Sequence, residues 1–156
     1  MKHYFRIVFN KIISKESNPF RLSCSAVLGI YLGLGPFLGI QTILAFIFAR
    51  ILQVNFAVVF IVLSLINNPW TMIPIAATGY SCGHWVSQSL LKVDLTHYDP
   101  SWMTWINAKI GSHVASYLGI KKLCFWYYFI GGNILAIVAI IFIAPFLYRY
   151  ALGYFR

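Results

Sequence analysis

Three long runs without a charged residue organise this sequence. They cover residues 22–49, 51–91 and 123–148, and only Arg50 separates the first two. A transmembrane helix needs about 20 apolar residues to cross a bilayer core of about 30 Å. Each run is long enough for one span, and the second is long enough for two. The pattern therefore predicts an all-α integral membrane protein.

The first two runs are interrupted by residues that break helices. These residues are Gly35, Pro36 and Gly39 in the first run, and Pro69 and Pro74 in the second. Proline removes a backbone donor and clashes with the preceding turn, while glycine opens the dihedral angles that a turn needs. Each run is therefore expected to form a hairpin of broken helices. The pieces are either re-entrant helices, buried in protein or lining a polar cavity, or kinked full-span hairpins; the sequence leaves both open.

The remaining segments predict parts at the membrane surface and a last span. Residues 1–20 place apolar side chains opposite basic ones at helical spacing, which indicates a basic interfacial helix. Residues 92–122 are expected to be a polar loop with an amphipathic helix that Asp99-Pro100 starts. The run 123–148 predicts a C-terminal transmembrane helix. The whole chain, 1–156, is expected to be a single membrane domain.

Composition and charge support this class and give it an orientation. Only 10% of the residues are charged, against about 25% in soluble domains. Five of the 12 basic residues precede the first run, and this bias predicts a multi-pass protein with a cytoplasmic N-terminus. The basic residues flank apolar runs instead of forming one face, so the expected partner is the lipid bilayer and not nucleic acid.

Small residues recur every four positions in two places. They are Ser25, Gly29 and Gly33 in the first run, and Gly79, Gly83 and Ser87 in the second. Such seams let membrane helices approach closely, so they are interpreted as packing faces. A homo-oligomer or a membrane partner could also form through them. The three cysteines form no CxxC pair, and neither a disulfide framework nor a metal site is expected.

Uncharged polar side chains beside the breaks form the candidate site. They are Gln41, Thr42, Asn67, Asn68 and Thr71. If the breaks meet near the bilayer midplane, freed carbonyls and helix N-termini there could bind an ion or a headgroup. The alternative is that these side chains only cap the broken helices.

His84 is the titratable member of a polar stripe on the helix that follows Pro69. The stripe consists of Thr71, Thr78, Ser81, His84 and Gln88. It indicates either a path for a substrate or a proton, or a face that hydrogen-bonds to neighbouring helices.

The residues at the two breaks resemble a known family pattern. The pattern consists of Ser25, Gly29, Gly33, Pro36, Gly39, Gln41 and Thr42, followed by Asn68, Pro69, Thr71 and Pro74. It resembles the bacterial membrane family catalogued as domain of unknown function 2062, over roughly residues 18–92. The resemblance implies a bacterial inner-membrane protein of uncharacterised activity, and no catalytic residue is established that could be carried over.

The sequence offers little to an enzyme. No carboxylate lies inside an apolar run, and no HExxH, GxSxG or P-loop motif is present. Neither catalytic residues nor a cofactor are expected. The paired breaks and the polar stripe favour a small permease or flippase-like protein for a small or lipid-linked solute. The alternative is a non-transporting scaffold or accessory subunit of an envelope complex, which the small-residue seams and the absence of buried charge favour.

Overall fold

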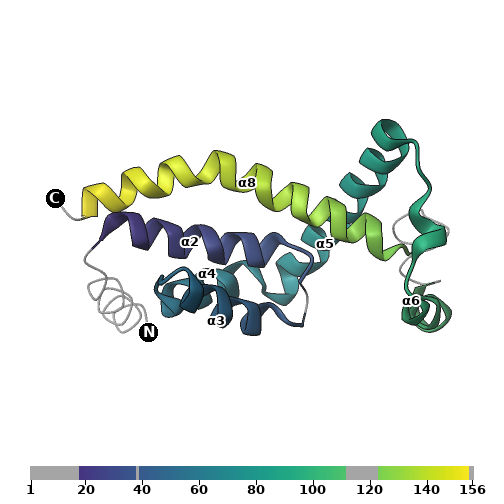
Figure 1. Cartoon of the computed structure of the whole chain (residues 1–156), viewed down its shortest axis with the longest axis horizontal. Helices are drawn as coiled ribbons and strands as arrows, with labels where there is room; N and C mark the ends of the chain where they lie inside the picture. The colour runs from purple at the N-terminus through teal and green to yellow at the C-terminus, as the bar shows by residue number, and fades with distance from the viewer. Residues whose placement is uncertain (1–17, 38, 112–122, 155–156) are drawn as a thin grey trace. The chain divides into compact units, whose positions relative to one another are not determined.

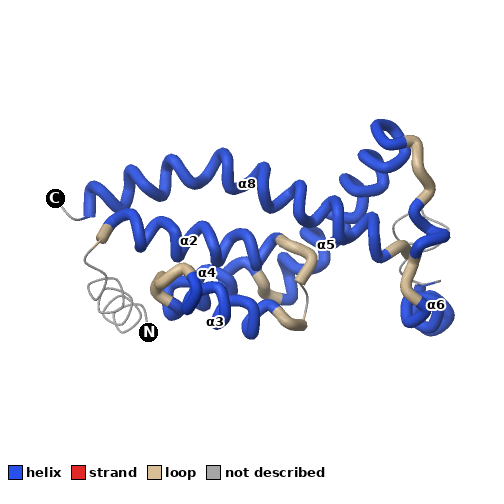
Figure 2. The backbone as a smooth tube through the Cα atoms, in the orientation of Figure 1, coloured by secondary structure: helices blue, strands red, loops and turns tan. Residues whose placement is uncertain are grey.

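The computed structural model describes residues 18–37, 39–111 and 123–154, and over these it is helical without strands (Figure 2). The all-α fold class is therefore confirmed. The expected interfacial helix over 1–20 lies almost wholly outside the described residues, as does the end of the amphipathic helix in 92–122. The elements in Figure 1 are α2 Pro19–Leu34, α3 Gln41–Ile51, α4 Phe56–Ile66, α5 Pro69–Val86, the π-helical turn η1 Ser87–Leu91, the 3-10 turn η2 Leu95–Tyr98, α6 Ser101–Ile106, the π-helical turn η3 Asn107–Gly111 and α8 Phe125–Tyr154.

The first predicted break lies where the glycines and the proline suggested. Helix α2 starts at Pro19 because the Asn18 side chain accepts the Phe20 N–H at 2.9 Å and proline suits the first helical position. It ends before Gly35, and α3 begins at Gln41. Gly39 has φ +89, a conformation that side chains with a Cβ rarely adopt. The local sequence thus sets both ends of this break.

The start of the second hairpin differs from the prediction. Arg50 and Ile51 belong to α3, and the chain turns only afterwards, with Gln53 at φ 53. Arg50 therefore lies in the last turn of α3 and does not mark the boundary between two helices. A cation in this position interacts favourably with the helix dipole. Helix α4 begins at Phe56 because the Asn55 side chain accepts the Ala57 N–H at 3.0 Å.

Pro74 does not break a helix, and this corrects its assignment as a break residue. It lies inside α5, which starts at Pro69 and continues to Val86. Proline inside a helix removes the hydrogen bond to the carbonyl four residues earlier, and here that carbonyl lies in the first turn of α5. Only Pro69 of the two prolines coincides with an interruption, after Asn67-Asn68.

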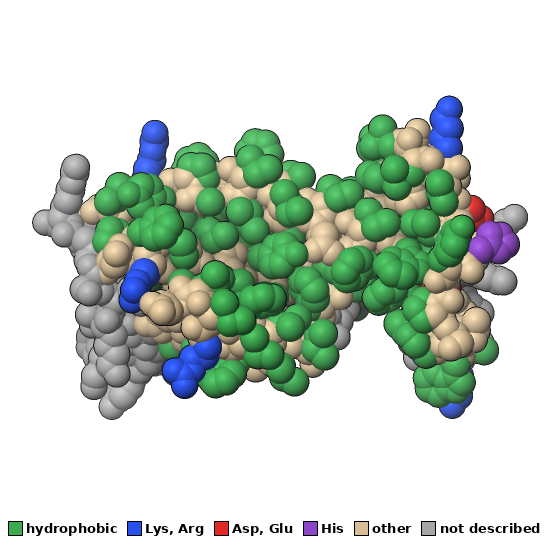
Figure 3. All heavy atoms as spheres, in the orientation of Figure 1, with side chains coloured by type: hydrophobic (Ala, Val, Ile, Leu, Met, Phe, Trp, Pro, Cys, Tyr) green, Lys and Arg blue, Asp and Glu red, His purple; other side chains and the backbone are tan. Residues whose placement is uncertain are grey.

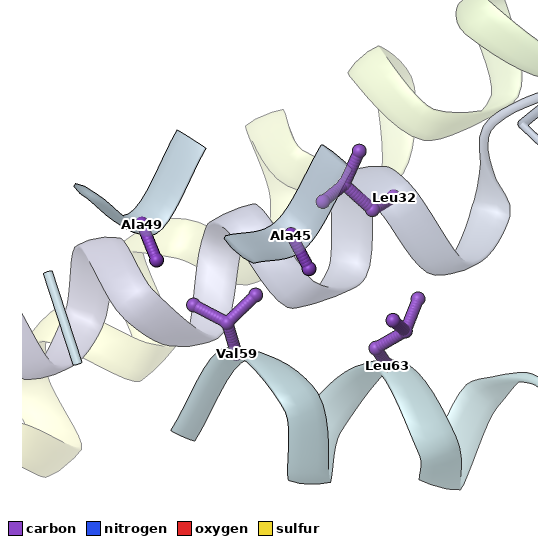
Figure 4. Close-up of a cluster of buried hydrophobic side chains, with 5 residues drawn as sticks. All are labelled: Leu32, Ala45, Ala49, Val59 and Leu63. Atoms are coloured by element: carbon purple, nitrogen blue, oxygen red, sulfur yellow. The ribbon is translucent and has the colours of Figure 1, made fainter. Parts of the chain in front are cut away.

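The chain divides into two compact units, residues 1–69 with 136–156, and residues 70–135. In the first unit, α2, α3 and α4 pack around a small apolar core. Figure 4 shows its five side chains, which come from the three helices and point toward one another: Leu32, Ala45, Ala49, Val59 and Leu63. Leucine and valine fill the space that the two alanines leave, so the three helices pack closely.

Helices α2 and α4 run parallel and in register along the first small-residue seam. The Ser25 hydroxyl accepts the Asn55 N–H at 3.0 Å. A Cβ on Gly29 would lie 2.8 Å from the backbone of α4, and one on Gly33 would lie 2.9 Å from the Ile66 side chain. Because the contacts advance together along both helices, the two helices end at the same level. This seam is a packing face within the chain.

The second seam packs α5 against the start of α8 within the second unit. A Cβ on Gly83 would lie 2.7 Å from the Tyr127 carbonyl carbon and 2.9 Å from the Gly131 nitrogen. A Cβ on Gly131 would lie 2.9 Å from the Gly79 carbonyl carbon. The two backbones therefore touch, and only glycine fits between them.

Among the described helices, α8 is the one long and apolar enough to cross a bilayer, from Phe125 to Gly153. It extends further than the predicted 123–148. Helices α4 and α5 qualify only as one bent pair, and α2 and α3 are shorter. Only 17% of the most apolar window of α8 is buried, whereas the core helix of a soluble protein would be mostly buried. Hydrophobic side chains are spread along the whole described part of the surface visible in Figure 3, and few charged side chains lie among them.

Candidate functional site

The two helix breaks of the first unit meet through a pair of side-chain amides. Gln41 is the first residue of α3, and Asn67 directly follows the last residue of α4. The Asn67 Nδ2 donates a hydrogen bond to the Gln41 Oε1. We call this pair, with the ends of α2, α3 and α4 around it, the amide junction. Two of the six predicted polar site residues are thus brought together.

The Gln41 amide is buried and only half satisfied. The side chain is 9% exposed. Its oxygen is used by Asn67, but its Nε2 has no hydrogen-bond partner in the part of the chain that the structure describes. An unsatisfied buried donor typically costs about 1–3 kcal/mol. The junction therefore holds a donor that an acceptor oxygen would stabilise.

The helix ends around Gln41 differ in how well they are capped. Among the residues that the structure describes, no side chain caps the N-terminus of α3 at Ile40, and the first N–H groups of a helix lack intrahelical acceptors. At the ends of α2 and α4, by contrast, the Gly35 N–H donates to the Tyr31 carbonyl and the Asn67 N–H to the Leu63 carbonyl, each at 2.8 Å. The junction therefore combines N–H groups at the start of α3 with carbonyl groups at the ends of α2 and α4.

An aromatic pair packs beside the end of α2. The rings of Tyr31 and Phe37 lie 5.8 Å apart. A Cβ on Gly35 would lie 2.8 Å from the Phe37 ring, so the glycine lets this ring fold back onto the helix end. Pro36 is buried in the same turn. The breaking residues thus give the first break a packed form, and both aromatics contact the apolar core.

Three other predicted polar residues have different surroundings. Thr42 is exposed. The Asn68 Nδ2 donates to the Leu65 carbonyl at 3.3 Å, which caps the end of α4. Thr71 belongs to the second unit, where it is half-buried. For Asn68 the geometry therefore fits the capping role.

His84 lies exposed on α5, and its ring meets the edge of Tyr127 at 5.1 Å. The Tyr127 hydroxyl is the centre of a polar network that the sequence did not single out. It donates to Asp94 Oδ1 at 3.0 Å, and it accepts from Gln88 Nε2 and from the Leu95 N–H, both at 3.3 Å. The C-terminal members of the stripe, His84 and Gln88, thus contact Tyr127 within the second unit.

Two carboxylates hold the loop before α6 against the start of α8. Asp94 accepts from Tyr127, and Asp99 Oδ1 accepts the Phe125 N–H at 2.9 Å. We call these two contacts the carboxylate clasp. Asp99 thereby caps the N-terminus of α8, and within the described ranges no side chain caps α6, which Pro100 precedes. Helix α6 does begin directly after Asp99-Pro100, at Ser101, but the Asp99 side chain accepts from α8 instead of capping α6.

The clasp predicts a pH-dependent stability. Hydrogen bonds from the Thr96 N–H, then from the Thr96 hydroxyl and from Tyr127, lower the pKa of Asp94. A lowered folded-state pKa means that stability is present above the unfolded-state pKa of about 3.9 and is lost as the pH falls through the folded-state value. The melting temperature should therefore fall as the pH is lowered from about 7 to about 3, and the fall should be smaller in Asp94→Asn. Identical pH profiles for the two proteins would contradict the role of this carboxylate.

Within the described ranges, no group of three or more His, Cys, Asp or Glu side chains is placed to hold a metal ion. Neither Gln41 nor Asn67 offers the thiolate, imidazole or carboxylate ligands that transition metals prefer.

Comparison with known proteins gives one match. A family model described as "Uncharacterized protein conserved in bacteria (DUF2062)" matches residues 2–154. The resemblance seen in the sequence is therefore confirmed over nearly the whole chain. No curated protein and no solved structure matches it.

Proposed function

The chain belongs to this uncharacterised bacterial family, and we propose that it is a multi-pass inner-membrane protein that moves a small or lipid-linked solute, as a permease or flippase does. The observation that carries the proposal is the unsatisfied Gln41 amide where two helix breaks meet. Secondary transporters build their sites from interrupted helices near the bilayer midplane. The amide junction likewise lies where helices are interrupted, between the end of α4 and the start of α3.

Helix lengths support a junction deep in the bilayer. Helix α2 has 16 residues, or about 24 Å, and α3 has 11, or about 17 Å. Their far ends carry Arg21 and Arg50, both exposed, and such charges stay at the headgroups. The α2–α3 hairpin then enters and leaves on one side, and its tip reaches about half of a 30 Å core. This is the re-entrant arrangement, with the basic end in the cytoplasm.

The exposed surface also favours a lipid environment. On α8, Ile141, Phe142 and Phe146 are exposed by 64%, 68% and 74%. On α3, Ile43 and Phe46 are exposed by 62% and 51%. Soluble monomers rarely expose apolar patches of this extent, whereas a bilayer covers them without cost.

The small-residue seams no longer favour the scaffold alternative. Both small-residue seams are filled by helices of the same chain, since Gly33 packs on Ile66 and Gly83 on Tyr127. Neither seam is left open for a partner helix. A homo-oligomer or membrane partner stays a prediction that would need a different surface.

The proposal is tested with the full chain reconstituted into phospholipid vesicles. One arm measures transbilayer movement of a fluorescent phospholipid by chemical quenching of the outer leaflet. The other arm measures efflux of a trapped small solute. We expect one of the two rates to exceed that of protein-free vesicles and to fall in Gln41→Leu. Rates equal to those of protein-free vesicles in both arms would refute transport and would favour the scaffold function instead.

A further inference from the structure

We propose that the outward face of α6 and η3 docks on the headgroup layer of an anionic phospholipid bilayer. The face consists of the exposed side chains of Trp102, Trp105 and Lys109, and we call it the aromatic face. It belongs to the second unit, whereas the amide junction belongs to the first. The inference rests on the membrane location in the proposed function and not on transport.

The opposite side of the same helical segment is tied to the chain. Met103 is buried, with 8% of its surface exposed. The Asn107 Nδ2 donates to the Leu123 carbonyl at 2.9 Å, and its Oδ1 accepts the Leu123 N–H at 3.0 Å. Positions four apart share one side of a helix. Met103 and Asn107 therefore turn their side inward and leave the aromatic face outward.

The aromatic face is apolar where a soluble protein would place polar side chains. Trp102 and Trp105 are exposed by 49% and 60%, although a surface helix in water normally turns its apolar side inward. In Figure 3, hydrophobic side chains gather over α6, with a cationic side chain at their edge. Tryptophan is enriched where membrane meets water, because its ring is apolar and its N–H finds a polar partner. The exposed rings therefore favour a bilayer surface as the partner.

Contacts with α8 place the aromatic face at the level where the candidate span begins. The span starts at Phe125, and the centroids of the Trp102 and Phe125 rings lie 5.3 Å apart. Asp99 accepts the Phe125 N–H at 2.9 Å, and the Trp126 Nε1 donates to the Tyr98 carbonyl at 2.7 Å. Because the end of a span lies at the headgroups, the segment bonded to it lies there as well.

The charges on this segment fit an anionic layer. The Lys109 Nζ lies 4.7 Å from the centroid of the Trp105 ring, so the cation and the ring face the same surroundings. Lys92, earlier in the same loop, is also exposed. The two carboxylates of the clasp accept hydrogen bonds from the start of α8. Since anionic lipids attract lysines at the membrane surface, Lys109 can pair with a lipid phosphate while Trp105 enters the layer.

Tryptophan fluorescence of the full chain in vesicles of phosphatidylcholine and phosphatidylglycerol tests the docking. One variant keeps Trp105 and has phenylalanine at the other tryptophan positions. If it does not fold, the difference in emission between wild type and Trp105→Phe serves in its place. Brominated lipids quench nearby tryptophan, and we expect bromine close to the headgroup to quench Trp105 more than bromine at the bilayer centre.

The other outcomes of this measurement overturn the docking. Quenching by iodide in the water, without an effect of bromine, would show that the face points into solvent. Stronger quenching by the deep bromine would place it inside the hydrocarbon core. Protection from iodide and from both bromines would show that protein covers it, from a second copy or another chain.

A second arm tests the preference for anionic lipid. In equal mixtures of the two lipids, bromine is carried by one or by the other. We expect an about fivefold preference for phosphatidylglycerol around Trp105, the effect of one lysine near an anionic surface. The preference should vanish in Lys109→Gln and persist in Arg149→Gln, which removes the same charge near the far end of α8.

Equal quenching by the two lipids in wild type, or an unchanged preference in Lys109→Gln, would overturn the anionic partner. The result is separable from the proposed function. Docking without transport would refute only transport, and transport without docking would refute only this inference.

Discussion

Replacement of Gly131 by leucine is expected to abolish accumulation of the folded protein in membranes. A Cβ at this position would overlap the backbone of Gly79 and Gly83 on α5, within 2.9 Å of the Gly79 carbonyl carbon. Backbone atoms cannot rotate away as the end of a side chain can, so α5 and α8 would have to separate. The free energy of unfolding should fall by more than the loss of about 1–3 kcal/mol that ordinary overpacking causes. Such a loss is a large part of a total stability of about 5–15 kcal/mol.

Gly153 provides the matched control for this substitution. It lies near the end of the same helix, and a Cβ there would meet nothing within 4 Å. Gly153→Leu should therefore accumulate like wild type, while Gly131→Leu should be nearly absent from isolated membranes and should melt at a much lower temperature. Equal amounts and equal melting temperatures for the two variants would show that the glycine contact between α5 and α8 does not support the fold.

The second large effect is expected at the amide junction, from a pair of substitutions that compensate each other. Asn67→Leu leaves the buried Gln41 amide with neither hydrogen bond, which should destabilise the protein by about 1–3 kcal/mol. Gln41→Leu should be costly for the converse reason, because Asn67 loses its acceptor. Gln41→Leu/Asn67→Leu replaces both partners by apolar groups and should be nearly neutral.

A double-mutant cycle measures this compensation. Unfolding free energies of wild type, both single variants and the double variant are compared in one detergent. We expect a coupling energy in the range of about 0.5–3 kcal/mol, which is typical of residues in contact. Strictly additive effects would show that Gln41 and Asn67 do not interact and that the two breaks do not meet.

The helix ends of the first unit were largely predictable because local residues set them. Gly35, Pro36 and Gly39 interrupt the first run, and Pro69 begins α5, as the chemistry of these residues dictates. The position of Arg50 was not predictable in this way, because a cation suits the last turn of a helix as well as the boundary between two helices.

Which residues touch depended on register and could not be derived from local pattern. Gln41 and Asn67 were candidates, but their contact follows from the parallel packing of α2 on α4, which places Gly33 against Ile66. No local pattern predicts the contact of Gly131 with α5, because a glycine inside an apolar run looks like any other part of the span.

The second unit contained the residues that sequence reasoning missed. Tyr127 was one aromatic among many in an apolar run, yet its hydroxyl joins Asp94 and Gln88. Asp99 caps α8 from 26 positions away, while its neighbour Pro100 suggested a nearby helix start. A search for hydroxyl groups close to the few acidic residues could have proposed the first contact, but not the second.

The transport rate of the folded double variant Gln41→Leu/Asn67→Leu in vesicles tests most directly whether the amide junction acts on a solute. If the junction binds the transported group, this variant should accumulate and melt like wild type, because no buried donor is left without a partner. Its transport rate should nevertheless fall to that of protein-free vesicles. A folded double variant that transports at the wild-type rate would show that the two amides only cap broken helices.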